Sequence, residues 1–140
     1  MTPLQTIAVG FDGSPSSEIA VRWAFATASH LEARVVLVHA VGLLEHQSRL
    51  DVPEEFTAAV ATIAEELDFE EDRISWLVDN GDSCSVLLRC IDEPVSADLL
   101  VVGSRGQGVH AGLMLGSTSL QLAERSTIPL VIVPSGRAAS

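Results

Sequence analysis

The chain has 140 residues, 47% of them hydrophobic, with a mean hydropathy of +0.34. This composition excludes a disordered chain and suits one domain over residues 1–140 with one substantial core. The net charge is −11, and all eight basic residues are arginines scattered from Arg22 to Arg137. Such a chain repels nucleic acid and anionic membranes. The absence of lysine excludes Schiff-base chemistry and a P-loop lysine.

The N-terminal sequence does not read as a signal peptide, because no basic region is followed by a long apolar run. The apolar stretches are far shorter than the roughly 20 residues of a membrane span. We therefore expect a cytoplasmic protein. Cys84 and Cys90 lie six residues apart in a predicted helix, on different faces, which favours packed thiols over a disulfide or a metal site.

Five short apolar runs predict strands that are buried on both faces, as in a parallel sheet. They are Ile7–Val9, Val35–Val38, Ile74–Val78, Leu99–Val102 and Leu130–Val133, the third being weakened by Ser75 and Trp76.

Four helices are predicted between these strands. An apolar stripe runs from Ala20 to Leu31, and Pro53 precedes a second stripe from Phe56 to Leu67. Asp82 is a cap for the third helix, and the fourth begins near Gly116 and ends before Pro129. The acidic run between Glu65 and Asp72 is interpreted as a solvated helix end and loop. The order βα, repeated four times before a last strand, predicts an open doubly wound α/β sheet in three layers.

The loop after the first strand carries Asp12 at the carboxyl edge of the sheet, where open α/β sheets bind ligands. One interpretation is a ligand contact, in which the carboxylate accepts hydrogen bonds from a ligand or reaches a bound cation. The other is an Asx turn or a cap for the helix that begins near Pro15. Phe11 beside it is either a ligand contact or part of the core.

The loop after the fourth strand, residues 103–118, contains five glycines and ends in Gly116-Ser117-Thr118 at the start of a helix. Glycines let backbone N–H groups approach an anion, and a helix N-terminus favours phosphate. The alternative is a flexible loop with an ordinary helix cap. The loop lacks the Walker A lysine, and it follows the fourth strand with no acidic strand end after it, so a Rossmann dehydrogenase fits poorly.

The spacing Gly103-x2-Gly106-x9-Gly116-Ser117 resembles the ATP-binding signature of the universal stress protein family. The segments Val9–Ser14, Val38–Ala40, Gly81-Asp82 and Ile128–Val133 also resemble that family, so the likeness covers essentially the whole chain in order.

The resemblance implies a five-stranded, mostly parallel sheet of order 3-2-1-4-5, similar to the adenine nucleotide alpha hydrolase fold. It also implies ATP as ligand, with or without Mg²⁺, and cyclic AMP as the alternative. The site residues it implies are Gly10, Asp12, Ala40, Val102, Gly103, Arg105, Gly106, Gly116, Ser117 and Thr118. Family members often pair through the last strand, so we expect a homodimer through Leu130 to Val133, whose apolar edge would otherwise invite association.

Catalytic groups are not convincing in this sequence. Hydrolysis would need a base and charge stabilisation at the γ-phosphate, for which Asp12, His110 and Arg105 are the weak candidates. We therefore expect a nucleotide-responsive binding module of stress or dormancy physiology with at most slow hydrolysis. A genuine ATPase and a cyclic-AMP binder remain the alternatives.

Overall fold

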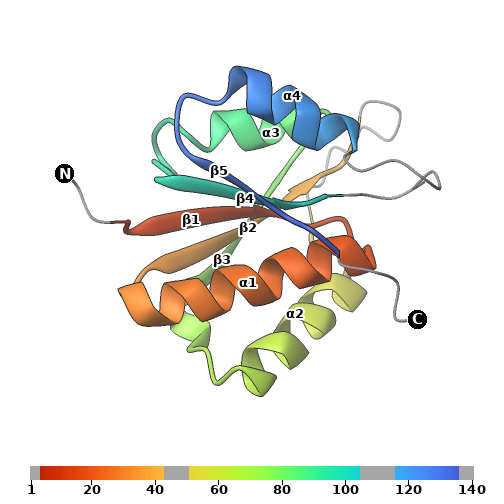
Figure 1. Cartoon of the computed structure of the whole chain (residues 1–140). Coiled ribbons are helices and arrows are strands. Elements are labelled where there is room, and N and C mark those ends of the chain that lie inside the picture. The colour runs from red at the N-terminus through yellow and green to blue at the C-terminus, as the bar shows by residue number, and fades with distance from the viewer. Residues whose placement is uncertain (1–3, 43–50, 105–115, 136–140) are drawn as a thin grey trace.

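A computed structural model describes residues 4–42, 51–104 and 116–135 of the chain (Figure 1). Its elements, in chain order, are β1 (Thr6–Gly10), α1 (Pro15–Leu31), β2 (Arg34–Ala40), α2 (Glu54–Glu66), the short 3-10 helix η1 (Glu71–Arg73), β3 (Ile74–Asp79), α3 (Ser83–Arg89), β4 (Leu99–Gly103), α4 (Ser117–Arg125) and β5 (Leu130–Val133). The strands form one sheet in the order β3-β2-β1-β4-β5, and every neighbouring pair is parallel. The predicted fold and strand order are confirmed.

Each helix begins where its sequence directs it to. Ser14 caps α1 by accepting a hydrogen bond from the Ser17 amide at 3.2 Å, and Pro15 occupies the first turn, where its missing N–H costs nothing. The helix ends at Glu32, whose φ of 56° is left-handed. The expected caps also hold for the last two helices, since Asp82 accepts from the Ser85 amide and Gly116 precedes α4.

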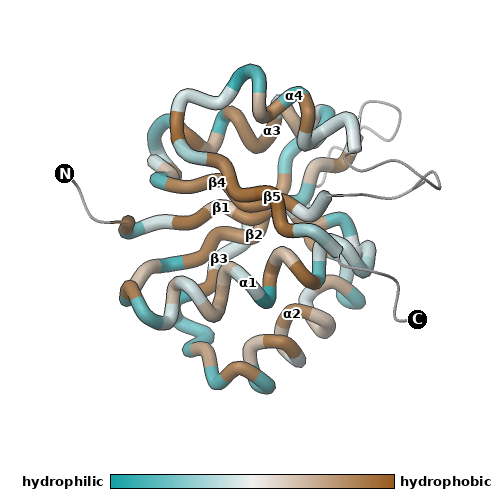
Figure 2. The backbone as a smooth tube through the Cα atoms, in the orientation of Figure 1, coloured by the Kyte–Doolittle hydropathy of each residue, from teal (hydrophilic) through white to brown (hydrophobic). Residues whose placement is uncertain are grey.

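The helices cover the sheet in two layers, with α1 and α2 on one face and α3 and α4 on the other (Figure 1). Brown, apolar strands fill the middle of the molecule, and teal segments lie on the outer surfaces of the helices (Figure 2). The strands are buried on both faces because alternate side chains enter two separate cores. One core, under α1 and α2, contains Phe25 and Val35, and the other, under α3 and α4, contains Val36 and Leu87.

Two expectations at helix ends need correction. Leu31 and Leu67 were predicted to continue apolar stripes, but these residues are 44% and 37% exposed; Leu31 is the last residue of α1, and Leu67 caps the C-terminus of α2. The acidic run from Glu65 to Asp72 is exposed as predicted.

The weaker third apolar run forms β3, which is an edge strand. This position at the edge of the sheet explains why Ser75 is tolerated there. Among the described residues, no helix combines the length and apolar character needed to cross a bilayer.

Candidate nucleotide site

β1 and β4 end next to each other at the carboxyl edge of the sheet. β1 pairs with β4 on one side and with β2 on the other, so the chain leaves these two strands in opposite directions. This is the topological switch point, where open α/β sheets hold their ligands. The two loops selected from the sequence therefore leave from neighbouring strands.

Asp12 shapes the first loop. Its Oδ1 accepts a hydrogen bond from the Ser14 amide at 2.9 Å, which is an Asx turn, while the capping of α1 is done by Ser14 itself. The Asp12 amide also lies 3.4 Å from the Ser17 hydroxyl, which donates to the Ser14 carbonyl. The carboxylate is only half-buried. Asp12 thus has the predicted turn role, and its position at the sheet edge leaves the ligand role open.

Aromatic side chains from the core under α1 and α2 pack against this loop. Phe11 is 3% exposed, so its interpretation as a core residue is correct. Its ring meets Phe56 edge-on at a centroid distance of 5.0 Å and Trp76 at 6.0 Å. Gly13 has a φ of +82°, and a Cβ there would lie 2.7 Å from the Phe56 ring. Glycine is required at this position both for the backbone conformation and for the contact with α2.

The two ends of the second loop are joined by hydrogen bonds. The Gly116 amide donates to the Ser104 carbonyl at 2.7 Å, and the Ser119 hydroxyl donates to the Gly103 carbonyl at 3.0 Å. The N-terminus of α4 is thereby fixed against the end of β4. Arg105 and Gly106, which were predicted to contact ribose and phosphates, lie outside the described residues.

Gly103 also touches the start of α1. A Cβ at Gly103 would lie 2.3 Å from the Ser16 hydroxyl oxygen and 2.6 Å from the Ser16 carbonyl oxygen. No side chain fits in that space, so the first turn of α1 packs directly on the end of β4. The N-termini of α1 and α4 therefore converge on Gly103 from opposite faces of the sheet.

The start of α4 is suited to an anion. Gly116 supplies no capping side chain, and the first described amide to bond back into the helix is that of Leu120, to the Gly116 carbonyl. The amides of residues 117–119 precede that bond, so they are available to a ligand. Ser117 is exposed and Thr118 half-buried, so both hydroxyls can contribute donors. Together with the helix dipole, these groups favour a phosphate without any lysine.

The remaining predicted positions have packing roles of their own. Val102 is 5% exposed in the core beneath α3 and α4. A Cβ at Gly10 would meet the Leu87 and Val102 side chains at 3.1 and 3.4 Å. Ala40 lies beyond Val38, the last residue of β2 that pairs with β1.

The sequence analysis gave His39 no role in the site, although it lies in the segment Val38–Ala40 that resembles the family. This residue lies near the end of β2, its ring meets Phe56 edge-on at 4.9 Å, and its Nδ1 is buried with no hydrogen-bond partner in the described structure. Burial lowers the pKa of His39 below 6.5, while the nearby Phe11 backbone and the Asp12 charge oppose that shift. A single polar residue inside the apolar run of β2 was the available signal. Within the described ranges, no group of three or more His, Cys, Asp or Glu side chains is arranged to hold a metal ion.

The model of the universal stress protein family matches residues 3–134. The chain belongs to this family. A universal stress protein of Mycolicibacterium smegmatis is 32% identical over 142 residues, which cover 91% of this chain and 45% of that protein. The chain thus spans about half the length of the curated relatives that it matches.

Solved structures agree with this assignment. A universal stress protein in complex with cAMP superimposes with a TM-score of 0.72 at 30% identity, covering 96% of this chain and all of that one (100%). A universal stress family protein of Arabidopsis thaliana with AMP bound gives a TM-score of 0.59 at 19% identity, covering 96% of this chain and 93% of that one. The second likeness shows the fold alone.

Proposed function

We propose that this universal stress protein binds ATP, with or without Mg²⁺, at the carboxyl edge of β1 and β4. Asp12 and the backbone around Ala40 would contact the adenosine, and the end of β4 with Arg105 and Gly106 the ribose and phosphates. Gly116, Ser117 and Thr118 would bind the phosphate tail. In this role the protein is a cytoplasmic, nucleotide-responsive regulator in stress or dormancy physiology, and its two buried free cysteines suit a reducing compartment.

The convergence of the α1 and α4 N-termini on Gly103 is the observation that carries this proposal. Two helix N-termini present their positive dipole ends to one place at the edge of the sheet, and α4 adds the amides of residues 117–119, which precede its first intrahelical bond. The chain has a net charge of −11 and no lysine, so a phosphate needs such fixed backbone donors. An acidic side chain, Asp12, lies nearby, as suits the hydroxyl and amino donors of a nucleoside.

Cyclic AMP is the second candidate, because the relative at 30% identity was solved with that ligand. The two nucleotides share the adenosine part of the site and differ in the phosphate tail. ATP would depend strongly on the start of α4, whereas cyclic AMP carries a single phosphodiester charge and would depend on it less.

The described residues favour nucleotide binding over ATP hydrolysis. The imidazole of His39 lies close enough to Asp12 to feel its charge, but its Nδ1 is buried and its ring is packed on Phe56, so it is not placed as a base for an attacking water. His110 lies outside the described residues. Hydrolysis, if present, would be slow.

A homodimer through β5 is part of the proposal. β5 is an edge strand, and Leu130, Val131 and Ile132 are only partly buried in the single chain. An apolar edge of this kind favours pairing with a second copy. Light scattering of the intact protein and of Val131→Lys tests it, since the charged side chain should convert a dimer to a monomer; a monomeric parent protein would refute it.

Calorimetric titration of nucleotide-stripped protein with ATP and, separately, cyclic AMP tests the ligand, with and without Mg²⁺. The informative variant is Ser117→Asp, which places a negative charge in the first turn of α4. That charge should stabilise the helix by about 0.5 kcal/mol, yet it should weaken ATP binding by about tenfold or more through repulsion of the phosphates. Gly106→Trp should abolish nucleotide binding, because it puts a large side chain into the glycine-rich loop that is proposed to contact the ribose and phosphates.

Ser83→Asp is the matched control, because Ser83 is exposed and occupies the same first position in α3. It changes the net charge equally and should leave the ATP affinity unchanged. Weaker ATP binding in Ser117→Asp alone supports the phosphate site at α4. Equal effects of the two substitutions, or no binding of either nucleotide by folded protein, would overturn it.

A further inference from the structure

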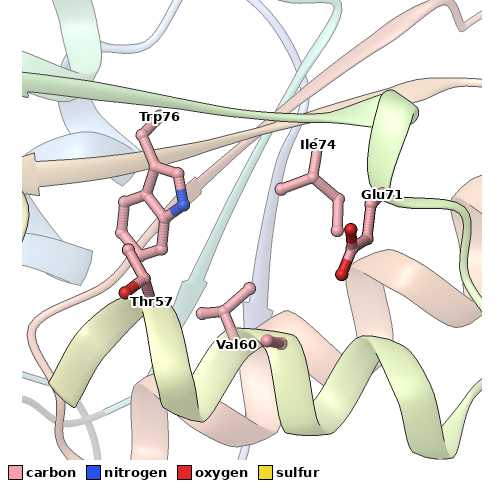
Figure 3. Close-up of a pocket in the computed structure, with 6 residues that line it drawn as sticks. Thr57, Val60, Glu71, Ile74 and Trp76 are labelled. Atoms are coloured by element: carbon pink, nitrogen blue, oxygen red, sulfur yellow. The ribbon is translucent and has the colours of Figure 1, made fainter. Parts of the chain in front are cut away.

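A pocket lies between the edge strand β3 and helix α2, beside the ring of Trp76 (Figure 3). It has a volume of about 200 Å³ and is lined by Thr57, Val60, Ala61, Glu71, Ile74 and Trp76. Figure 3 shows Val60 and Thr57 rising from α2 toward the strand, with Trp76 and Ile74 facing them from β3. The carboxylate of Glu71 points to the same space from η1, at the end opposite to Trp76 (Figure 3).

The two polar groups at the ends of this pocket have no partners among the described residues. The indole Nε1 of Trp76 points into the gap toward Ile74, and no described residue offers it an acceptor (Figure 3). Glu71 makes no ion pair there, because Arg73 pairs with Glu70 and donates to the carbonyls of Ala28 and Ala33. The pocket thus has one N–H donor at one end, one carboxylate at the other, and an apolar floor between them.

This combination identifies the chemistry of an occupant. A carboxylate is complementary to a cation, an indole N–H to a carbonyl oxygen, and the apolar floor of Ile74 and Val60 to an aliphatic chain. An arginine residue in an extended segment supplies all three, because its stem packs on apolar surface while its guanidinium pairs with a carboxylate. The volume is below the roughly 300 Å³ of the smallest common small-molecule sites, which suits one side chain better than a nucleotide.

The surrounding surface is complementary to a basic segment. The exposed run beside the pocket contains six carboxylates within eight residues, at positions 65, 66, 68, 70, 71 and 72. Among the described residues two of them are paired, Glu66 with Arg22 at 2.7 Å and Glu70 with Arg73 at 3.6 Å. β3 is also an edge strand of the sheet. Among the described residues no strand pairs with its outer side, so its backbone there can form hydrogen bonds with an extended peptide.

We propose that this pocket is a docking site for an arginine side chain carried by an extended, basic segment of a partner protein. The guanidinium binds Glu71, the aliphatic stem lies on Ile74 and Val60, and a main-chain carbonyl of the segment accepts the Trp76 indole hydrogen. The site is separate from the proposed nucleotide site and does not depend on it.

The test uses a pentapeptide with a central arginine, acetyl-Val-Thr-Arg-Thr-Val-amide, and its counterpart with citrulline, which has the same shape without the charge. Titration is followed by ¹H–¹⁵N NMR of the full chain, up to about 10 mM peptide because a single anchor gives weak affinity. The arginine peptide should shift the Trp76 indole resonance and the amides of Ile74 and Val60, and bind about tenfold more tightly than the citrulline peptide.

Two variants and their controls decide the outcome. Glu71→Gln should weaken binding of the arginine peptide by about tenfold, whereas Glu124→Gln, on the exposed side of α4, should not change it. Ala61→Trp should fill the pocket and abolish binding, whereas Ala58→Trp, exposed on the same helix but outside the pocket, should not. Equal affinity for both peptides, shifts that map to another surface, or full binding by Glu71→Gln would overturn the proposal, and ATP binding should be unchanged in every variant.

Discussion

The two faces of the sheet are packed with different kinds of side chain. All four phenylalanines and both tryptophans lie in or against the core under α1 and α2. The core under α3 and α4 has only aliphatic residues and the two cysteines among its described members. Rings are large and rigid, so the first face supports the Asp12 loop from beneath and leaves a pocket beside Trp76. Small, branched side chains instead let α3 approach β1 closely at Gly10.

The largest effect on stability should come from removing a ring from the core under α1 and α2, which we call the aromatic face. Phe25 is fully buried and stacks on Phe69 with centroids 4.6 Å apart. Phe25→Ala should lower the free energy of unfolding by about 4 kcal/mol, and Leu87→Ala, in the aliphatic core, by about 3 kcal/mol. Urea denaturation measures both. A smaller loss for Phe25→Ala than for Leu87→Ala would show that the aromatic face does not dominate stability.

A smaller effect is expected where the aromatic face meets the Asp12 loop. Gly13→Ala combines a left-handed backbone, φ +82°, with a Cβ placed 2.7 Å from Phe56, and should cost about 3 kcal/mol. Gly42→Ala is the control, because Gly42 has a φ of +97° but open space around its Cβ, so it should cost only about 1 kcal/mol. Thermal denaturation of both variants gives the difference.

Phe56 is the source of that difference. In the double variant Gly13→Ala with Phe56→Leu, the narrower side chain removes the clash, so the cost of Gly13→Ala should fall by about 1 kcal/mol. An unchanged cost in the Phe56→Leu background would mean that backbone strain alone acts at Gly13, and that the loop is not supported by the aromatic face.

The sequence allowed much of this arrangement to be predicted, for reasons that are local. Strand and helix positions follow from apolar periodicity and capping residues such as Asp82, which act over a few residues. The contact of Gly103 with Ser16 could not be predicted, because it depends on how closely α1 packs on β4. The pocket at Trp76 depends in the same way on how α2 lies beside an edge strand. His39 received no role because its lack of a hydrogen-bond partner depends on its burial in the folded protein. A single polar residue next to an apolar run does not reveal that burial.

The smallest effect concerns pH and His39, which among the described histidines is the one that packs on the aromatic face. Burial depresses the pKa of His39 in the folded protein below its ordinary value of 6.5, so the unfolded chain takes up its proton first as the pH falls. Stability from this group is therefore fully present above pH 6.5, declines as the pH drops through that value, and levels off below the folded pKa. Asp12 across the loop moderates the decline because its charge favours the imidazolium.

His39→Gln should remove this part of the pH dependence, so the free energy of unfolding should fall less between about pH 7.5 and pH 5.5 than in the parent protein. His30→Gln, a change at an exposed histidine in the last turn of α1, serves as the control. Urea denaturation at the two pH values measures the slope, and the carboxylates that titrate lower contribute equally to all three proteins. If His39→Gln kept the parent slope, the proton would not be excluded from the aromatic face. If it flattened the slope while His30→Gln did not, the aromatic face would be the part of the fold that senses acid, next to the loop proposed to hold the nucleotide.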